Sequence, residues 1–418
     1  MFGNTVSQLI GRIISSFTIV VASIIIARQF GPEGYGDFVK ITTYVGFFYL
    51  LADFGLNAVY LQKTAKQVVE PRAFASLSWQ MLLGLRLLMS VCLVLIALGI
   101  LSFFPQGLGQ GYTPLVRLGI VLLVPVIVAQ AITTTTNALF QKMLRYDLST
   151  QAQNIGSFFL LATALLLTRF SAINGPMLGV AAVFVGSVVT AIVALYLVHH
   201  KLGTIQPMYS PSTYISLFHE SMPLGFALIF NLIYFHSDSV VLALTRSTQE
   251  VGIYGLAYKV FELPLVVPIF FMNSVYPLLL EAQHGTGRGS RKIFDASALF
   301  LFGSSLCIAG VLWFLAPWVV YVRPDFAASI APLRVLVLGL PIFFLSGLFM
   351  WFLIAQKKQR TLLIIHGIAM LGNILFNIAL VPGYGYMASA WVTICSEFFV
   401  LIVTAIYVLP AMRQGGKS

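Results

Sequence analysis

The chain has 418 residues, of which 59% are hydrophobic and only 9% are charged. Soluble domains contain about 25% charged residues, so this composition excludes an ordinary soluble protein and indicates a membrane protein with many spans. The net charge of +11 does not indicate nucleic acid as a partner, because the basic residues gather at span ends, where topology explains them. The three cysteines lie inside apolar runs without metal-ligand spacing, which argues against a disulfide framework or a zinc site.

Apolar runs of about 20 residues, the length that crosses a bilayer, recur along the whole chain. No small-residue cleavage site follows the first run, so we expect it to be a span and not a signal peptide. The pattern predicts an all-α, polytopic fold. The twelve predicted spans are 6–27, 38–60, 77–103, 114–140, 148–168, 176–198, 219–245, 252–280, 296–320, 332–355, 362–381 and 387–409.

Lys and Arg are concentrated in the loops on one side of these spans. By the positive-inside rule, the even-numbered loops and both termini are predicted to be cytoplasmic. Three further cations, Lys40, Arg117 and Arg334, lie near span ends, where we expect their long side chains to reach the interface.

The two halves of the chain resemble each other in the order of their motifs. Arg28 to Gly36 follows span one and Arg246 to Gly255 follows span seven, while Gly175-Pro-Met177 opens span six and Gly385-Tyr-Met387 opens span twelve. Six spans per half give a parallel repeat, with a pseudo-two-fold axis along the membrane normal and a substrate path between the halves. We therefore predict two six-helix lobes, 1–205 and 206–418.

Three cations lie at membrane depth, where Lys or Arg costs roughly 2.5–3.5 kcal/mol on insertion scales. Arg12 in span one is either an interfacial anchor or a ligand for phosphate, which a guanidinium binds well. Arg86 lies in span three. Lys259 in span eight precedes Glu262 by one helical turn, so the two form either a self-neutralising pair or a switch that substrate or protonation opens. We consider Arg12, Lys259 and Arg86 as candidate substrate-binding residues.

Four carboxylates inside spans are candidates for coupling to a proton or sodium gradient, because protonation or ion binding removes their desolvation penalty. The alternative is a structural carboxylate paired with one of the buried cations. These residues are Asp53, Asp238, Glu262 and Glu397.

Span eight contains three prolines, which predict a bent helix after Lys259. Asn273, Asn373, Asn377 and the Thr133–Thr136 run are predicted to form hydrogen bonds between helices and not substrate contacts. No phosphate-binding loop, nucleophile elbow or paired metal-binding His occurs, so the sequence predicts neither an enzyme nor a bound cofactor.

Five segments spread over nearly the whole chain form a set whose order and spacing are more specific than any one of them. The segments are Ala27 to Gly36, Asp53-Phe-Gly-Leu56, Ser221-Met-Pro-Leu-Gly225, Asp238 with Val251 to Ala257, and Val381-Pro-Gly-Tyr-Gly385. Together they resemble the polysaccharide flippases of the multidrug/oligosaccharidyl-lipid/polysaccharide exporter superfamily, most closely the O-antigen (Wzx-type) translocases.

The resemblance implies two six-helix lobes whose cleft opens to each side of the membrane in turn, lined by spans one, two, seven and eight. It implies an undecaprenyl-diphosphate-linked oligosaccharide as cargo, flipped from the cytoplasmic to the outer leaflet of the bacterial inner membrane. Expected partners are this lipid-linked substrate, membrane lipid, and the polymerase and chain-length proteins of the same pathway. The resemblance leaves the sugar open.

Two other functions remain as alternatives. A drug/cation antiporter of the same fold would depend on the carboxylates and not on the cations. A membrane glycosyltransferase or polymerase would need a catalytic acidic residue in an outside loop, and these loops are short. A sugar permease of the major facilitator type is disfavoured, because Gln62–Ala75 lacks the expected acidic-basic loop.

Overall fold

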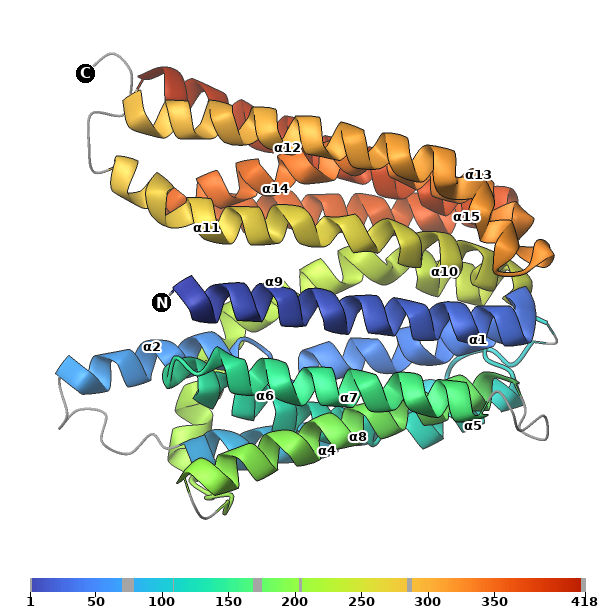
Figure 1. Cartoon of the computed structure of the whole chain (residues 1–418), viewed down its shortest axis with the longest axis horizontal. Coiled ribbons are helices and arrows are strands. Elements are labelled where there is room, and N and C mark those ends of the chain that lie inside the picture. Colours follow the sequence, from blue (N-terminus) through green and yellow to red (C-terminus); the bar gives the residue numbers. More distant parts are fainter. Residues whose placement is uncertain are drawn as a thin grey trace. The chain divides into compact units, whose positions relative to one another are not determined.

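The computed structural model describes the backbone of residues 2–69, 79–107, 109–167, 175–202, 205–283 and 288–414, and most of their side chains. Within these ranges the regular elements are helices, apart from one isolated bridge between Gln106 and Gly111 (Figure 1). The all-α prediction is confirmed.

The chain divides into two compact units, Met1–Leu232 and Ile233–Ser418, and the dividing point lies inside helix α9. The predicted lobe boundary at 205/206 stays a prediction. The first unit contains α1 (Phe2–Leu51), α2 (Leu56–Val69), α4 (Trp79–Leu101), α5 (Pro114–Leu123), α6 (Val126–Lys142), α7 (Tyr146–Leu167), α8 (Gly175–Leu202) and the start of α9 (Pro211–Thr245). The second contains the rest of α9, then α10 (Thr248–Glu262), η1 (Leu263–Leu265), α11 (Val266–Gln283), α12 (Arg288–Leu315), η2 (Ala316–Tyr321), η3 (Pro324–Ser329), α13 (Ile330–Leu338), α14 (Leu340–Ala355) and α15 (Gln359–Gln414).

By length and composition, 9 helical segments of the described chain can cross a membrane. Two of these are pairs of helices joined at a glycine with positive φ: α1 bends at Gly31 and α15 bends at Gly385. Helix α7 is not among the 9, because its first half carries polar residues, yet it packs along α1 and α8. Counting each pair as two and adding α7 gives the twelve predicted spans.

A matching contact in each unit supports the predicted repeat. A side-chain carbon added at Gly175, where α8 begins, would lie 2.8 Å from the ring of Phe30, just after the end of the first span. A carbon added at Gly385, where the last span begins, would lie 2.5 Å from Glu250, in the corner after the seventh span. In both halves, therefore, the start of the sixth helix presses on the corner that follows the first helix.

Other helices are also interrupted where the sequence contains proline. Helix α10 ends at Glu262, and the short 3-10 turn η1, containing Pro264, leads into α11. The prolines therefore interrupt the α-helix after Lys259, while the predicted bend stays a prediction. The prediction that the Lys40 side chain reaches the membrane interface is wrong. This lysine is 1% exposed and donates to the backbone oxygen of Gly111 at 2.9 Å, which satisfies its ammonium inside the protein.

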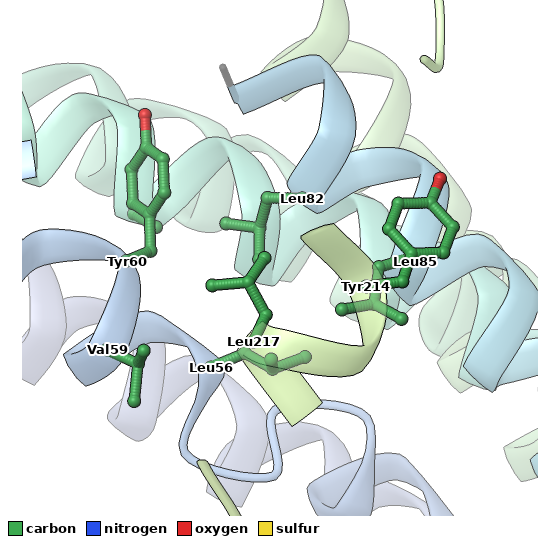
Figure 2. Packing of buried hydrophobic residues seen from close by; sticks show 8 residues of the cluster. Leu56, Val59, Tyr60, Leu82, Leu85, Tyr214 and Leu217 are labelled. Atoms are coloured by element: carbon green, nitrogen blue, oxygen red, sulfur yellow. The ribbon is translucent and has the colours of Figure 1, made fainter. Parts of the chain in front are cut away.

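An apolar cluster fixes α2, α4, α6 and α9 around one point of the first unit. Figure 2 shows how Leu56 and Tyr60 of α2 lie beside Leu82 and Leu85 of α4 and Leu217 of α9. Each of these side chains is almost fully buried, and a buried leucine of this kind contributes about 1.5–3 kcal/mol. The cluster holds the start of α2 next to residue 86 of α4.

Candidate functional site

The predicted second span is broken in the middle. Residues 52–55 leave the helix, with Phe54 at φ 42° and Gly55 at φ 74°, and α2 then begins at Leu56. Asp53 stabilises the new helix start, because its Oδ1 accepts the backbone N–H of Asn57 at 3.3 Å. Gly55, the residue just before α2, adopts its positive φ without steric cost. The break thus places a carboxylate beside a helix N-terminus inside a predicted span.

Arg86 is the cation that faces this break. Its Nη2 donates to Asp53 Oδ1 at 2.6 Å and to Asn57 Oδ1 at 2.8 Å, and its Nη1 donates to Thr135 Oγ1 at 3.3 Å. The Arg86 side chain is 0% exposed while that of Asp53 is 32% exposed. The Arg86 Nε is buried and has no hydrogen-bond partner among the described residues. Asp53 therefore neutralises a charge that water cannot reach.

Two of the five segments that carry the family resemblance are in contact at this break. The ring of Phe54 stacks on Phe218 at 5.2 Å between centroids and meets Phe226 edge-on at 6.2 Å. A side-chain carbon added at Gly225 would lie 2.5 Å from the Phe54 ring. Asp53-Phe-Gly-Leu56 and Ser221-Met-Pro-Leu-Gly225 therefore form one packing unit between the start of α2 and α9.

We expect Gly225→Ala to destabilise the protein by about 1–3 kcal/mol, because the new methyl group overlaps a stacked ring that cannot move freely. Gly310→Ala on α12 is the matched control, since nothing lies within 4 Å of the carbon added there. The free energy of unfolding of the two variants, measured in detergent, is the quantity to compare. Equal stability of the two variants would contradict the close packing of Phe54 on α9.

The second unit contains a buried carboxylate on α9. Asp238 is 2% exposed, and its Oδ2 accepts the hydroxyl of Tyr254 at 2.5 Å and that of Thr393 at 3.3 Å. Its Oδ1 accepts the backbone N–H of Ser239 at 2.6 Å. Among the described residues, no Lys or Arg forms a salt bridge with Asp238.

A second buried carboxylate, Glu397 on α15, is 6% exposed. Its Oε2 accepts the hydroxyl of Tyr234 at 2.7 Å, and its Oε1 is hydrogen-bonded to Ser346 of α14. Tyr234 lies one turn before Asp238 on α9, and Thr393 lies one turn before Glu397 on α15. The two carboxylates therefore lie in neighbouring helical turns of one row of hydrogen-bonded polar residues between α9 and α15. We call this row, which includes Tyr234, Asp238, Thr393 and Glu397, the polar seam.

The asparagines of α15 extend this polar seam. Asn373 Oδ1 accepts the hydroxyl of Ser237 at 2.6 Å and the Nδ2–H of Asn377 at 2.9 Å, while Asn373 Nδ2 donates to Ser396 at 3.0 Å. The Oδ1 of Asn377 is buried and accepts no hydrogen bond from the described residues. The seam thus combines two carboxylates, several hydroxyls and an unused amide oxygen, which are the ligands that hard cations prefer.

The Thr133–Thr136 run behaves differently from its prediction. All four hydroxyls donate to backbone oxygens of their own helix α6. Among the described residues, the one hydrogen bond between this run and another helix is accepted by Thr135 Oγ1 from the Arg86 guanidinium of α4. The prediction of hydrogen bonds between helices is therefore wrong for most of this run, because an acceptor one turn earlier is closer. For Asn373, which bonds to Ser237 on α9, it is confirmed.

Lys259 pairs with its predicted partner. Its Nζ lies 3.1 Å from Glu262 Oε2, and the two side chains are 36% and 35% exposed. Arg12 lies on α1, but its side chain is outside the described part of the chain, so its role stays a prediction. Of the predicted site residues, the structure brings together Asp53 with Arg86 and Lys259 with Glu262, and it joins Asp238 and Glu397 through the polar seam.

Sequence reasoning did not identify the hydroxyl partners of the two buried carboxylates as site residues. The spacing contained a usable signal, because Tyr234 and Asp238, like Thr393 and Glu397, are four residues apart and so share a helix face. Asn57 was missed for another reason, because its partner Arg86 comes from a different helix. Thr135 belongs to the run predicted to bond between helices, and its hydrogen bond with Arg86 bears this out for that residue.

Comparison with known families identifies the chain. The family described as polysaccharide biosynthesis protein matches residues 1–283, and the family described as MatE matches residues 223–379. The chain belongs to the polysaccharide biosynthesis protein family. None of the curated proteins compared with it matches in sequence.

Solved structures show the same fold at low sequence identity. A multidrug resistance MATE family transporter of the MOP superfamily, in an inward-facing conformation, matches with a TM-score of 0.80 and 13% identity, covering 99% of both chains. The lipid II flippase MurJ matches with a TM-score of 0.72 and 15% identity, covering 100% of this chain and 90% of that one. A MOP superfamily transporter from Pyrococcus furiosus matches with a TM-score of 0.64 and 12% identity, covering 99% and 95%. The predicted fold is confirmed, and the family match over residues 1–283 agrees with the predicted resemblance to polysaccharide proteins.

Proposed function

We propose that this protein is a flippase that moves an undecaprenyl-diphosphate-linked oligosaccharide from the cytoplasmic to the outer leaflet of the bacterial inner membrane. The observation that carries the proposal is the polysaccharide biosynthesis match over residues 1–283, combined with a fold shared with a lipid II flippase. The lipid tail remains in the bilayer while the head group crosses through the protein. This avoids leaving sugar hydroxyls without hydrogen bonds in hydrocarbon, which costs several kcal/mol per group. The cargo is moved unchanged, so no enzymatic step is needed.

The polar seam supplies the coupling in this proposal. A buried carboxylate without a neighbouring Lys or Arg is stabilised by binding a cation or a proton. Asp238 and Glu397 are such carboxylates within the described residues. We assign a sodium ion to Asp238, with oxygens of Thr393 and Asn377 as further ligands. Asp53 and Glu262, each paired with a cation, then have positioning roles.

Lys259 supplies an anion contact that can be switched. A half-exposed pair such as Lys259 with Glu262 contributes only about 0–1 kcal/mol, so a diphosphate can replace the carboxylate at little cost. The pair sits directly before the break at Pro264, where α10 ends. Arg12 is the second proposed phosphate ligand. Arg86 contacts substrate only if Asp53 releases it, so in this proposal it acts through the position of Asp53.

Removing the anion contacts tests the binding role. We expect Lys259→Ala, alone and with Arg12→Ala, to lower surface polysaccharide at matched protein levels, because a charge-assisted hydrogen bond contributes about 1.5–3 kcal/mol, or roughly 10- to 100-fold in binding. Lys292→Ala, at an exposed position on α12, is the control. Unchanged polysaccharide in the double variant would exclude the anion site.

The cargo itself is read most directly from cells that lack the protein. Loss of a flippase should cause its lipid-linked substrate to accumulate, and mass spectrometry of the lipid extract then gives the sugar composition. The same measurement can be made in cells that lack the polymerase or the chain-length proteins. The lipid-linked species that accumulates then shows whether each of these expected partners acts before or after the flippase. The absence of any lipid-linked sugar change on depletion would contradict the proposed cargo.

A drug/cation antiporter is the second candidate, favoured by the MatE match over residues 223–379. It shares the coupling carboxylates but needs no cation for its cargo. It predicts that depletion sensitises cells to cationic dyes and leaves surface glycans unchanged, the reverse of the flippase result.

A further inference from the structure

Glu397 differs from Asp238 in the kind of groups that surround it. Both partners of Glu397, Tyr234 and Ser346, are hydroxyls, which can donate or accept a hydrogen bond. Asp238 instead has Oδ1 committed to the backbone N–H of Ser239, which can only donate. A donor that cannot reverse favours the ionised carboxylate at Asp238. The two hydroxyls around Glu397 can hydrogen-bond to the carboxyl group in its ionised form or in its protonated form.

Ser346 has two acceptors for its single hydrogen. Its Oγ is hydrogen-bonded to Glu397 Oε1 and also lies 3.1 Å from the backbone oxygen of Phe343. When Glu397 is ionised, the Ser346 hydroxyl donates to it. When Glu397 carries a proton, Oε1–H donates to Ser346 Oγ, and the serine hydrogen turns to Phe343. Tyr234 donates to Oε2 in both forms, so no buried group loses its partner when the proton arrives or leaves.

The titratable groups near Glu397 come from three helices. On α9 these are Tyr234 and, one turn further, Asp238; on α10, Tyr258 lies close enough to interact electrostatically with Asp238, Glu262 and Glu397. On α15 itself His366 interacts electrostatically with Glu397, while α14 contributes the hydroxyl of Ser346. Among the described residues, no Lys or Arg forms a salt bridge with Glu397, so its immediate neighbours are hydroxyls and not a fixed positive charge.

His366 lies beside Tyr234, one of the two hydroxyl partners of Glu397. Its ring meets Tyr234 edge-on at 6.4 Å between centroids, and its Nδ1 lies 3.0 Å from the backbone oxygen of Leu362. A carbonyl only accepts, so Nδ1 carries the hydrogen of this contact. His366 is half-buried and lies two turns into α15, toward the end of the span that we expect to face the cytoplasm.

We propose that Glu397, held by Tyr234 and Ser346, is a proton-binding site of the second unit, distinct from the ionised Asp238. It deepens the coupling role in the proposed function by giving each buried carboxylate its own ion. Two like charges in one low-dielectric seam repel, so a proton on Glu397 also favours a charged Asp238.

Infrared spectroscopy of the purified full-length protein in detergent tests the site without cargo or gradient, so its result is independent of the flippase proposal. We expect a carboxylic-acid C=O band at neutral pH that is lost in Glu397→Gln and kept in Asp238→Asn. Ser346→Ala removes the acceptor of the acid hydrogen and should shift the band. Thr404→Ala is the matched control, because this buried hydroxyl of α15 bonds only to backbone oxygens of its own helix and should leave the band in place.

A band that survives Glu397→Gln, or that disappears in Asp238→Asn, would overturn the assignment. If Glu397→Gln does not fold, Ser346→Ala decides, since an unshifted band there would equally exclude an acid hydrogen bonded to Ser346. Loss of the band together with unchanged surface polysaccharide would leave the proton site standing and exclude only its link to cargo transport.

Discussion

Replacing Asp53 by alanine should destabilise the protein by about 3 kcal/mol, near the lower end of the range for breaking a buried ion pair. The Arg86 side chain is fully buried, and its strongest hydrogen bond, at 2.6 Å, goes to Asp53. Without the carboxylate the guanidinium keeps its charge but cannot reach water. Because the Asp53 side chain is 32% exposed, some water can enter after the substitution, which keeps the effect below the upper limit. The free energy of unfolding in a denaturant titration measures it.

A second substitution separates the unpaired charge from other effects. Arg86→Met removes the charge while retaining the volume, so the double variant Asp53→Asn with Arg86→Met should recover most of the lost stability. Asp147→Asn is the control for an ion pair near the surface. Asp147 pairs with Arg145 at 2.9 Å, but that arginine is 43% exposed, so water can solvate it after the substitution and we expect a much smaller change than for Asp53→Ala. A double variant no more stable than Asp53→Ala would contradict the buried-charge explanation.

The twelve spans could be predicted because bilayer thickness requires an apolar run of about 20 residues, and this requirement is visible in sequence. The break at residues 52–55 could not. Asp53 and Gly55 are single interruptions in a long apolar run, and only the contact of Phe54 with α9 shows that the helix stops there. Helix α7 shows the opposite case, a helix that persists despite a weak signal in the sequence. Its first half is less apolar than the neighbouring helices, and packing against α1 and α8 holds it in place.

The same distinction explains which site contacts were predictable. Lys259 and Glu262 are three residues apart on one helix, so their pairing follows from helical geometry. Asp53 and Arg86 come from different helices, and the partner of Arg86 was left open among several carboxylates. The apolar cluster around Leu56 and Leu85 decides it, because it brings the start of α2 against α4. Pairing between helices therefore depends on packing that no local pattern records.

Replacing Asp238 by asparagine should abolish stabilisation of the protein by sodium. The wild-type protein should gain about 2.7 kcal/mol when sodium exceeds its dissociation constant 100-fold, because the ion binds the folded state only. Asp238→Asn removes the buried charge that attracts the ion but keeps the shape of the side chain. Without sodium the variant should be at least as stable as the wild type, since an unpaired buried carboxylate is costly. The thermal unfolding midpoint, followed as sodium chloride is added, reports both effects.

Choline chloride at equal ionic strength separates sodium binding from general screening by salt. Asp295→Asn is the matched substitution, because this carboxylate of α12 is 66% exposed and should leave the sodium response intact. Thr393→Ala removes one oxygen ligand and should weaken the response without abolishing it, whereas Glu397→Gln should leave it in place if that residue carries a proton. A full sodium response in Asp238→Asn would place the ion elsewhere. A response lost equally in Glu397→Gln and Asp238→Asn would show that the two carboxylates form one site, because only a shared ion makes both of them necessary.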